Sequence, residues 1–466
     1  MSTAPKYPLR YVARATIEFE TPFIIGGGSD DIFFDDVFVA DANGLPALPG
    51  SSLAGILRHA WAEAGNGNGN DLFGFQEGDE GHGSRLSISW GYIHDSTNRP
   101  VEGIILDRKT VDEDVVLREA KLLTARDHVR ISHKGTAADG GKFDERSVSA
   151  GHRFSFELLL EGSEGDQDAW SRLLGLLRTA AIRIGGKTRR GYGQFRVITL
   201  AAKCFNLATE DGFRDFSTLP VTLTKKSSLV DVLDKIANPE ADAVTATLIL
   251  KPEAFWMIGG GFDGEVDMAP LKANRIVWKD GRGSMEPNRV IVPGSAVKGS
   301  IAHRVAFHYN RLSGVFAGEG VKPEAHTGEN NPAVSTLFGC VKKDGGGQRG
   351  RVIISDIFVE RPGEQKILNH VSIDRFTGGA RVLEGALFNE KPYYGGDGFT
   401  LNVTVSEAGM IGDARVRQAL GAALRDLAEG SLAVGGGAGR GNGYFRADGG
   451  VRWNEAGNAW IAGGTQ

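Results

Sequence analysis

Apolar residues along this chain recur with both the helical and the strand period. Between residues 53 and 61 they form one helical stripe, made of Leu53, Ile56, Leu57, Ala60 and Trp61. This spacing of three and four residues predicts an amphipathic helix. Val297, Ile301 and Val305 repeat the stripe in the second half of the chain. Stretches such as RFSFELLL and FTLNVTV alternate between apolar and polar positions, which predicts strands.

Two further segments, 170–184 and 416–430, carry apolar residues at helical spacing. Each of them follows an alternating stretch and precedes a glycine-rich turn into a strand. Strands and helices in this order are typical of an α+β unit of the split βαβ kind, with an antiparallel sheet and helices on one face. We therefore expect an α+β protein.

The same order of segments occurs twice. ALPGSSLAGIL around Pro49 matches IVPGSAVKGSI around Pro293, DLFGF matches TLFGC, RLSISW matches RVIISD, and GGKTRRGYGQF matches GGAGRGNGYF. An ordered recurrence at nearly constant spacing indicates a duplicated domain. We predict a first domain over residues 1–202, a linker over 203–242 and a second domain over 243–466.

Composition and charge narrow the class of protein. The chain has 53 basic and 58 acidic residues, a net charge of −5, which argues against binding nucleic acid by bulk cationic attraction. Two cysteines cannot form a disulfide framework, so a reducing compartment is expected. No apolar run is long enough to cross a membrane and no signal sequence is evident. We expect a cytoplasmic protein without membrane contact.

Each half ends in a glycine-rich segment with positive charge. The first segment carries Lys187, Arg189 and Arg190, and the second carries Arg440. A backbone with few Cβ atoms approaches phosphates closely, and its N–H groups and the arginines supply donors. A basic turn without a ligand is the alternative, and its recurrence favours phosphate contact. Tyr192 offers a surface on which a base could stack.

The entry to the first helix of each half is a second candidate anion site. Ser51 and Ser295 lie at predicted helix N-termini, where free N–H groups favour anions, and Lys298 adds a cation to the second site. Simple helix capping is the alternative. A loop rich in carboxylates precedes each of these helices, over residues 29–41 and 262–274. A carboxylate beside a bound phosphate repels it, so such an acid is expected only where a divalent cation lies between the two groups or where the acid takes part in catalysis.

Together these motifs resemble the RAMP superfamily, specifically the repeated backbone subunits of type III CRISPR effector complexes. The resemblance rests on the sequence PGSS at the entry to the first helix, the segment IDRFTGGA, and the glycine-rich loop GGKTRRGYG near the end of the first half. Two such domains in one chain are similar to the double-domain backbone proteins of type III-D systems. The resemblance implies two tandem modified ferredoxin-like, or RNA-recognition-motif, domains with thumb insertions. The thumbs correspond to residues 128–147 and 370–391.

The resemblance also implies partners and a reaction. The expected partners are a CRISPR guide RNA, a single-stranded target RNA and other type III subunits. Target cleavage would use a loop aspartate with a divalent metal ion, Mg²⁺ or Mn²⁺, while the ribose 2′-hydroxyl attacks the adjacent phosphate. The matching acids, which would also bind the metal, are Asp35 and Asp267, with Asp36 as the neighbouring alternative. Lys134 and Arg375 in the thumbs are expected to contact RNA.

The sequence is compatible with three alternatives for the activity of this chain. Only one of the two aspartate sites need be active. A second enzyme class on this fold, the guide-processing endoribonucleases, uses histidine without metal, and His59, His303 and His308 are candidates for such a role. A third alternative is a non-catalytic scaffold that holds guide and target RNA while other subunits cut.

Overall fold

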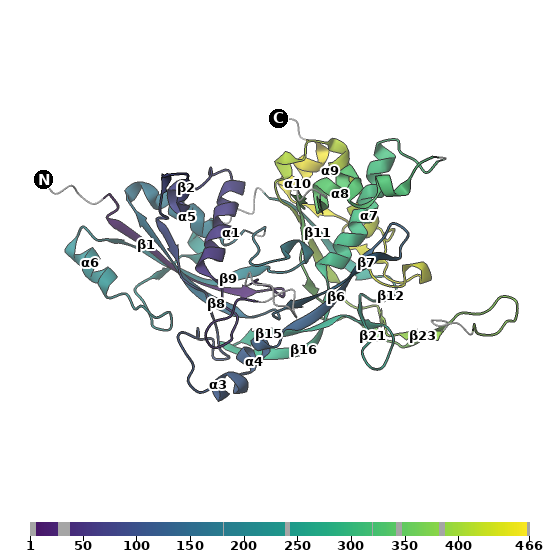
Figure 1. The fold of residues 1–466 in the computed structure, drawn as a ribbon, viewed down its shortest axis with the longest axis horizontal. Helices are drawn as coiled ribbons and strands as arrows, with labels where there is room; N and C mark the ends of the chain where they lie inside the picture. The colour runs from purple at the N-terminus through teal and green to yellow at the C-terminus, as the bar shows by residue number, and fades with distance from the viewer. Residues whose placement is uncertain are drawn as a thin grey trace.

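The structure is a computed structural model, and it describes residues 6–26, 38–179, 181–237, 243–318, 320–341, 347–381 and 387–463. Two antiparallel sheets form its framework, one in each half of the chain (Figure 1). Helices lie on one side of both sheets. In the described residues, no helix is long and apolar enough to cross a membrane.

The first sheet has the order β10–β9–β1–β8–β4, with β5 also paired to β8. Its strands are β1 (Leu9–Phe19), β4 (Leu86–Ile88), β5 (Tyr92–Ile93), β8 (Arg153–Gly162), β9 (Phe195–Asn206) and β10 (Val230–Asp231). Helices α1 (Gly50–Glu63) and α5 (Gln167–Leu176) connect these strands and contact each other. The four main strands are β1, β4, β8 and β9 in chain order. If they are numbered 1 to 4 in that order, their order across the sheet is 4-1-3-2. This is the ferredoxin-like arrangement of a split βαβ unit.

The second sheet repeats this topology, with the order β19–β25–β11–β26 and β27 paired to β11. Its strands are β11 (Val244–Pro252), β19 (Val352–Ile354), β25 (Phe399–Val405), β26 (Phe445–Ala447) and β27 (Arg452–Trp453). Helices α7 (Gly294–Leu312) and α9 (Ala414–Ala428) cover it, together with α8 (Pro332–Phe338) and α10 (Glu455–Ala462). The expected α+β fold of two tandem ferredoxin-like domains is confirmed.

Smaller elements decorate each half. In the first half these are α2 (Asn70–Phe73), β2 (Phe75–Glu77), β3 (Glu80–His82), α3 (Lys109–Glu113), α4 (Val115–Lys121), β6 (Thr124–Ile131), β7 (Ala137–Ser147) and α6 (Glu210–Ser217). In the second half they are β12 (Phe255–Trp256), β13 (Gly259–Gly261), β14 (Ala269–Pro270), β15 (Lys272–Lys279), β16 (Arg282–Val292), β17 (Gly339–Val341), β18 (Gly347–Arg349), β20 (Ile357–Phe358), β21 (Glu364–Gln365), β22 (Leu368–Val371), β23 (Leu387–Glu390) and β24 (Tyr393–Tyr394).

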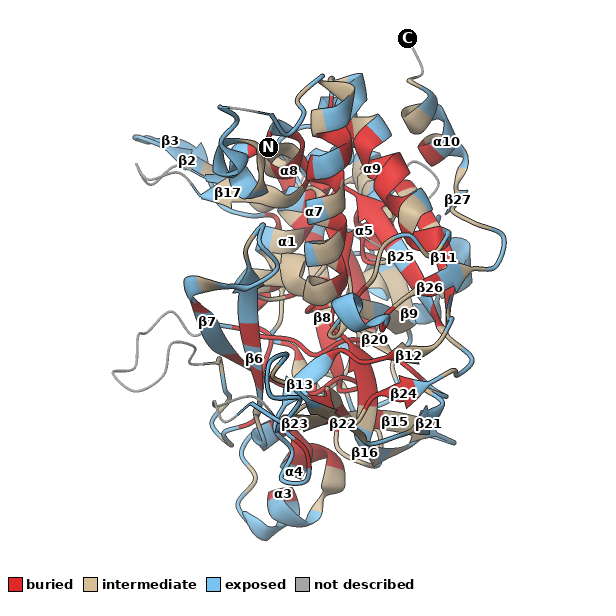
Figure 2. Ribbon diagram, turned by 90° about the vertical axis from the view of Figure 1, so that its right-hand side faces the viewer, coloured by how far each residue is buried: buried red, intermediate tan, exposed pale blue. Residues whose placement is uncertain are grey.

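Each half has its own apolar core. The stripe predicted from Leu53, Leu57 and Trp61 is buried against β1 and β8, and the stripe from Val297 to Val305 is buried against β11 and β25. Figure 2 shows buried segments in the interior strands and helices, whereas the hairpins at the periphery are largely exposed. Two separate cores are what a duplicated, independently packed unit requires.

The helix expected over 170–184 is shorter in the structure. It ends at Leu176, and Ile184 lies beyond it, where its backbone N–H donates to the Gly193 carbonyl in the glycine-rich turn. The segment expected to form the linker also has structure of its own. It continues β9 to Asn206, forms α6, and adds β10 to the first sheet, where Leu233 and Ile236 pack on the first core.

Candidate nucleic-acid interface

A two-stranded hairpin extends from each half in the position expected for the thumb. We call β6 with β7 the first thumb and β22 with β23 the second thumb. In the first thumb, Arg126 pairs with Glu145 and His128 with Phe143. The second thumb has the same register, with Leu368 opposite Glu390 and His370 opposite Phe388. The hairpins are therefore equivalent residue by residue.

A buried glutamate joins the first thumb to the glycine-rich turn. Glu145 is 1% exposed, and it is ion-paired with Arg190, while Lys187 Nζ lies 3.5 Å from it. His128 Nε2 lies 3.1 Å from its other oxygen, and the His128 ring stacks on Phe143. Burial raises the pKa of Glu145, but His128 and the charges of Arg190 and Lys187 outweigh this effect and lower the pKa to about 2. Glu145 is thus a carboxylate at neutral pH.

The second thumb has the same arrangement. Glu390 is fully buried, and its oxygens accept hydrogen bonds from Arg440 at 2.7 Å and pair with His370 at 3.0 Å. The His370 ring stacks on Phe388, and the Arg440 guanidinium lies over the same phenyl ring, as Arg190 does over Phe143. The duplication therefore preserved a set of four residue types, here called the thumb-base quartet, made of His128, Phe143, Glu145 and Arg190 in the first half and of His370, Phe388, Glu390 and Arg440 in the second.

The glycine-rich turn of the first half lies beside the start of its first helix. In the first half, α1 and the turn at Gly185 and Gly186 line a hollow of about 230 Å³. Ser51 is exposed and Ser295 half-buried at the two helix starts. The residue that precedes each helix is Pro49 or Pro293, and neither proline offers a side-chain cap. At the start of α7, the buried Asp356 carboxylate accepts the Gly294 N–H at 2.8 Å, so this helix start already has a protein anion as its partner.

Two of the predicted RNA-binding cations contact the other half of the chain. Arg189 donates from Nε to the Gly350 carbonyl at 2.7 Å, and Lys298 donates to the Arg189 carbonyl at 3.1 Å. Burial is the main cause that lowers the pKa of Arg189 to about 10 and that of Lys298 to about 8, and the neighbouring arginines lower both further. These side chains connect the halves, and their role in binding RNA stays a prediction.

The predicted contacts at the thumb ends are accessible. Lys134 lies in the exposed turn of the first thumb, and Arg375 lies in the turn of the second. The second turn also exposes 87% of Phe376 and 55% of Ile373. Positive and apolar groups together at a hairpin end suit contact with the backbone and the bases of a nucleic acid.

Of the three predicted catalytic acids, the structure describes one, Asp267. Asp35 and Asp36 lie outside the described residues. Asp267 is exposed in the loop between β13 and β14, and its carboxylate accepts a hydrogen bond from the Asn389 backbone N–H at 2.9 Å. The Asp267 N–H donates in return to the Asn389 side chain at 2.8 Å. These bonds connect the acidic loop to β23, next to Glu390 of the quartet.

The donors around Asp267 suit a metal ion only in part. Neighbouring Glu265 is paired with Lys391 at 2.6 Å, and Asp263 accepts the N–H groups of Glu265 and Val266 within its own loop. No group of three potential ligands includes Asp267 in the described part of the chain. Mg²⁺ is commonly held by one or two carboxylates with substrate phosphates. Asp267 therefore fits a metal ion that nucleic acid helps to bind.

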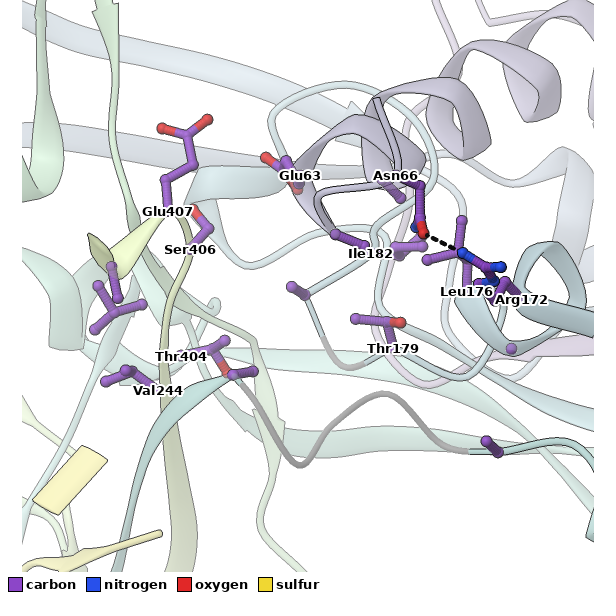
Figure 3. Close-up of a pocket in the computed structure, with 18 of the residues that line it drawn as sticks. Glu63, Asn66, Arg172, Leu176, Thr179, Ile182, Val244, Thr404, Ser406 and Glu407 are labelled. Atoms are coloured by element: carbon purple, nitrogen blue, oxygen red, sulfur yellow. Dashed lines mark hydrogen bonds between the residues drawn. The ribbon is translucent and has the colours of Figure 1, made fainter. Parts of the chain in front are cut away.

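In the described residues, potential metal ligands come together at a different place, in the exposed cluster of His59, Glu63 and Glu407. It lies at the edge of a cavity of about 740 Å³ between the halves, shown in Figure 3 with Glu63 and Glu407 on facing elements. Arg349 lies 3.0 Å from His59, and Arg351 lies 3.2 Å from Glu407. These guanidinium groups neutralise the acids and oppose a cation there.

Two other sequence expectations meet a different environment. Tyr192 is fully buried, with Arg126 over its ring, so it is not available to stack on a base. His308 is buried and paired with Asp426 at 2.8 Å, whereas His59 and His303 are exposed.

The structure adds residues that sequence reasoning missed. Glu145, Glu390 and Asp356 are buried acids that organise the thumbs and the contact between the halves. A signal was present for the first two, because each follows by two residues the phenylalanine, Phe143 or Phe388, that ends the matching segment. No such signal existed for Asp356, whose partner Arg126 lies 230 residues away.

Comparison with known proteins agrees with the duplicated fold. The family model described as RAMP superfamily matches residues 16–196 and 255–446. Among solved structures, a chain of "Type III-B Cmr-beta Cryo-EM structure of the Apo state" is similar, with 14% identity, a TM-score of 0.31, and coverage of 41% of this chain and 98% of that chain. A search of curated proteins gives no match. The family model matches both halves, covering most of the chain, and the chain belongs to the RAMP superfamily.

Proposed function

We propose that this chain is an RNA-binding backbone subunit of a type III CRISPR effector complex and that it cleaves RNA complementary to the guide. Membership of the RAMP superfamily supports a role in such a complex. The glycine-rich turns and thumbs of the two halves, together with the start of α1, would hold the guide RNA. Each half then provides one equivalent unit for binding the strand.

The observation that carries this proposal is the position of Asp267. Its carboxylate is exposed, and its loop is hydrogen-bonded to β23 beside Glu390, which in turn holds Arg440. An acid, a thumb and a basic glycine-rich turn are therefore connected by direct contacts. A strand that followed the turn and crossed the thumb would pass the acid.

The reaction would break one bond of the target backbone. The 2′-hydroxyl loses its proton and attacks the adjacent phosphorus, the bond to the 5′-oxygen breaks, and that oxygen takes up a proton. The products are a 2′,3′-cyclic phosphate and a 5′-hydroxyl. A divalent ion bound by Asp267 would stabilise the charge that develops on the phosphate. Asn389 orients the Asp267 carboxylate.

Cleavage mapping in the assembled complex tests the proposal. With Mg²⁺ present, Asp267→Ala should remove one cut in the target and retain target binding, and Asp35→Ala should remove a different cut. Asp263→Ala is the matched control, since it removes a carboxylate from the same loop that already accepts two backbone hydrogen bonds. The control should retain every cut.

Three outcomes would separate the alternatives. Cutting that persists in a chelator would support the histidine-based reaction, although the pairing of His308 with Asp426 argues against that residue. Retention of all cuts in the Asp35→Ala, Asp267→Ala double variant would support the non-catalytic scaffold. Loss of target binding in Asp267→Ala would show that the aspartate has a structural role.

A further inference from the structure

Glu390 lies where three parts of the second half meet. Its carboxylate is buried, and it accepts hydrogen bonds from Arg440 at 2.7 Å and from Asn442 at 3.3 Å, both in the glycine-rich turn. It also pairs with His370 of β22 at 3.0 Å. Through its side chain, Glu390 therefore joins the glycine-rich turn to the second thumb.

The backbone of the same residue joins the thumb to the acidic loop. Glu390 and Met268 form a parallel β-bridge. The Met268 N–H donates to the Asn389 carbonyl at 3.2 Å, and the Met268 carbonyl accepts the Lys391 N–H at 3.0 Å. Together with the bond between Asp267 and Asn389, these contacts add the loop as a short third strand beside β23. Adjacent strands lie about 4.8 Å apart, so Asp267 follows the position of β23.

Further contacts anchor the loop on both sides of Asp267. Before it, Val266 is buried and Glu265 pairs with Lys391 at 2.6 Å. After it, Ala269 is buried in β14. Asp267 itself is exposed between these anchored residues. The loop therefore holds this aspartate at a defined place while the residue stays accessible.

Arg440 can bind a second anion besides Glu390. Its side chain is 40% exposed, and a guanidinium carries five N–H donors. The donors that Glu390 does not use suit the oxygens of a phosphate. The Glu390 carboxylate holds the guanidinium in one orientation, so a phosphate bound to Arg440 would have a set position relative to Asp267.

The burial of Glu390 indicates a specific role for its charge. A buried carboxylate is unfavourable unless it is paired and hydrogen-bonded, and Glu390 has three partners from the turn and from β22. A satisfied polar network of this kind holds its members in one arrangement. An apolar side chain would pack in the same space without the desolvation penalty, but it would leave Arg440 without a fixed orientation.

We propose that Glu390 is a positioning residue for the cut that depends on Asp267. Its backbone holds the acidic loop and its side chain holds Arg440, so the distance between the Asp267 carboxylate and a phosphate bound to Arg440 is fixed. Glu390 is buried and does not touch the reacting atoms. This role rests on the proposed function and adds to it the residue that sets the geometry of the cleavage site in the second half.

Single-turnover cutting in the assembled complex tests this role. Glu390→Gln keeps the size of the side chain and removes its charge. It should lower the rate constant of the Asp267-dependent cut about tenfold or more, since small misplacements of reacting groups have effects of this size, and it should leave target binding intact. The other cut in the same complex should keep its rate. Glu145→Gln is the matched control, and the same change in the first half should leave the Asp267-dependent cut unaffected.

A distance measurement gives a readout that does not depend on cutting. In a chain with Cys204→Ser and Cys340→Ser, spin labels on Phe262→Cys and Gly439→Cys report the distance between the acidic loop and the glycine-rich turn. Both positions are exposed, and a Cβ at Gly439 would meet no atom within 4 Å. Electron paramagnetic resonance should show one narrow distance distribution, and Glu390→Gln should broaden it.

A second variant covers the case in which Glu390→Gln loses its cooperative thermal unfolding and so does not fold. Arg440→Lys changes the partly exposed partner of the buried carboxylate. It keeps the positive charge and removes the planar fork of donors. This variant should slow the Asp267-dependent cut about tenfold or more and leave the other cut unchanged. An unchanged rate would contradict the positioning role.

The outcomes separate the positioning role from the proposed function. If Asp267→Ala removes a cut while Glu390→Gln leaves the rate of that cut or the label distances unchanged, the positioning role is wrong and the proposed function stands. Equal slowing of both cuts, or loss of target binding, in Glu390→Gln would show a general structural role and would also overturn it. If Asp267→Ala retains every cut, the proposed function fails and the positioning role fails with it.

Discussion

The base of the first thumb is ion-paired with the second half of the chain through Arg126 and Asp356, whereas the equivalent position in the second thumb holds the uncharged Leu368. Both bases carry the same quartet, in which a buried glutamate holds an arginine of the glycine-rich turn and a histidine of the hairpin. Around the quartet the halves differ, since Arg126 and Tyr192 of the first correspond to Leu368 and Asn442 of the second. The quartet therefore belongs to each half by itself, whereas Arg126 also serves the contact between the halves.

The largest expected change in stability is at the charged contact between the halves. Arg126→Ala leaves the Asp356 carboxylate buried without its ion-pair partner, and loss of one partner of a buried pair costs about 3–5 kcal/mol. Leu368→Ala, at the equivalent position, should lower the free energy of unfolding by about 1 kcal/mol or less. Urea unfolding of both variants as monomers measures the difference. Equal effects would show that the first thumb base does not depend on the second half.

The quartet of the first half should make the chain sensitive to acid. The pKa of Glu145 is about 2, below its ordinary 4.5, so the ionised group stabilises the fold above about pH 4.5. This contribution is lost as the pH falls toward 2. Glu145→Gln should cost about 2–3 kcal/mol at pH 7 and flatten the loss of stability between these pH values. Unfolding midpoints measured across this range check the prediction, and an unchanged pH profile in the variant would contradict it.

The smallest expected effect distinguishes two glycines of the same turn. Gly191 and Gly441 both have positive φ, of 112° and 88°, so alanine strains either turn by about 1 kcal/mol. Only Gly191→Ala also pushes a Cβ into the Asp356 carboxylate, which should add about 1–2 kcal/mol. Thermal unfolding of the two variants gives the comparison. Equal shifts would mean that the contact at Gly191 relaxes without cost.

The main helices and strands could be predicted from the spacing of apolar residues along the chain. The apolar stripes at Leu53 and Val297, the alternating strands and the recurring motifs predicted both ferredoxin-like units, because helix and strand periods depend on neighbouring residues. Hairpins also lie where the matching segments predicted the thumbs, but they begin at Thr124 and Leu368 instead of His128 and His370. The helix over 170–184 was predicted too long, since the bond between Ile184 and Gly193 depends on the turn that closes later in the chain.

Residue roles were harder to predict than elements. Arg189 and Arg190 are adjacent and chemically alike, yet one contacts Gly350 of the second half and the other holds Glu145 of the first thumb. Tyr192 has the composition of a stacking residue and is nonetheless buried. Nothing in the local sequence separates these possibilities, because each depends on which distant group occupies the same space.

The sequence by itself determined the duplicated α+β fold, the order of the elements along the chain and the presence of an acidic loop and a basic turn in each half, and the family resemblance added the thumbs. Only the tertiary structure decided which of these groups meet. Asp356 reached Arg126 across 230 residues, and Asn389 reached Asp267 across 122. The physical reason is that periodicity is a property of neighbouring residues, whereas burial and ion pairing depend on how two separately folded units pack together.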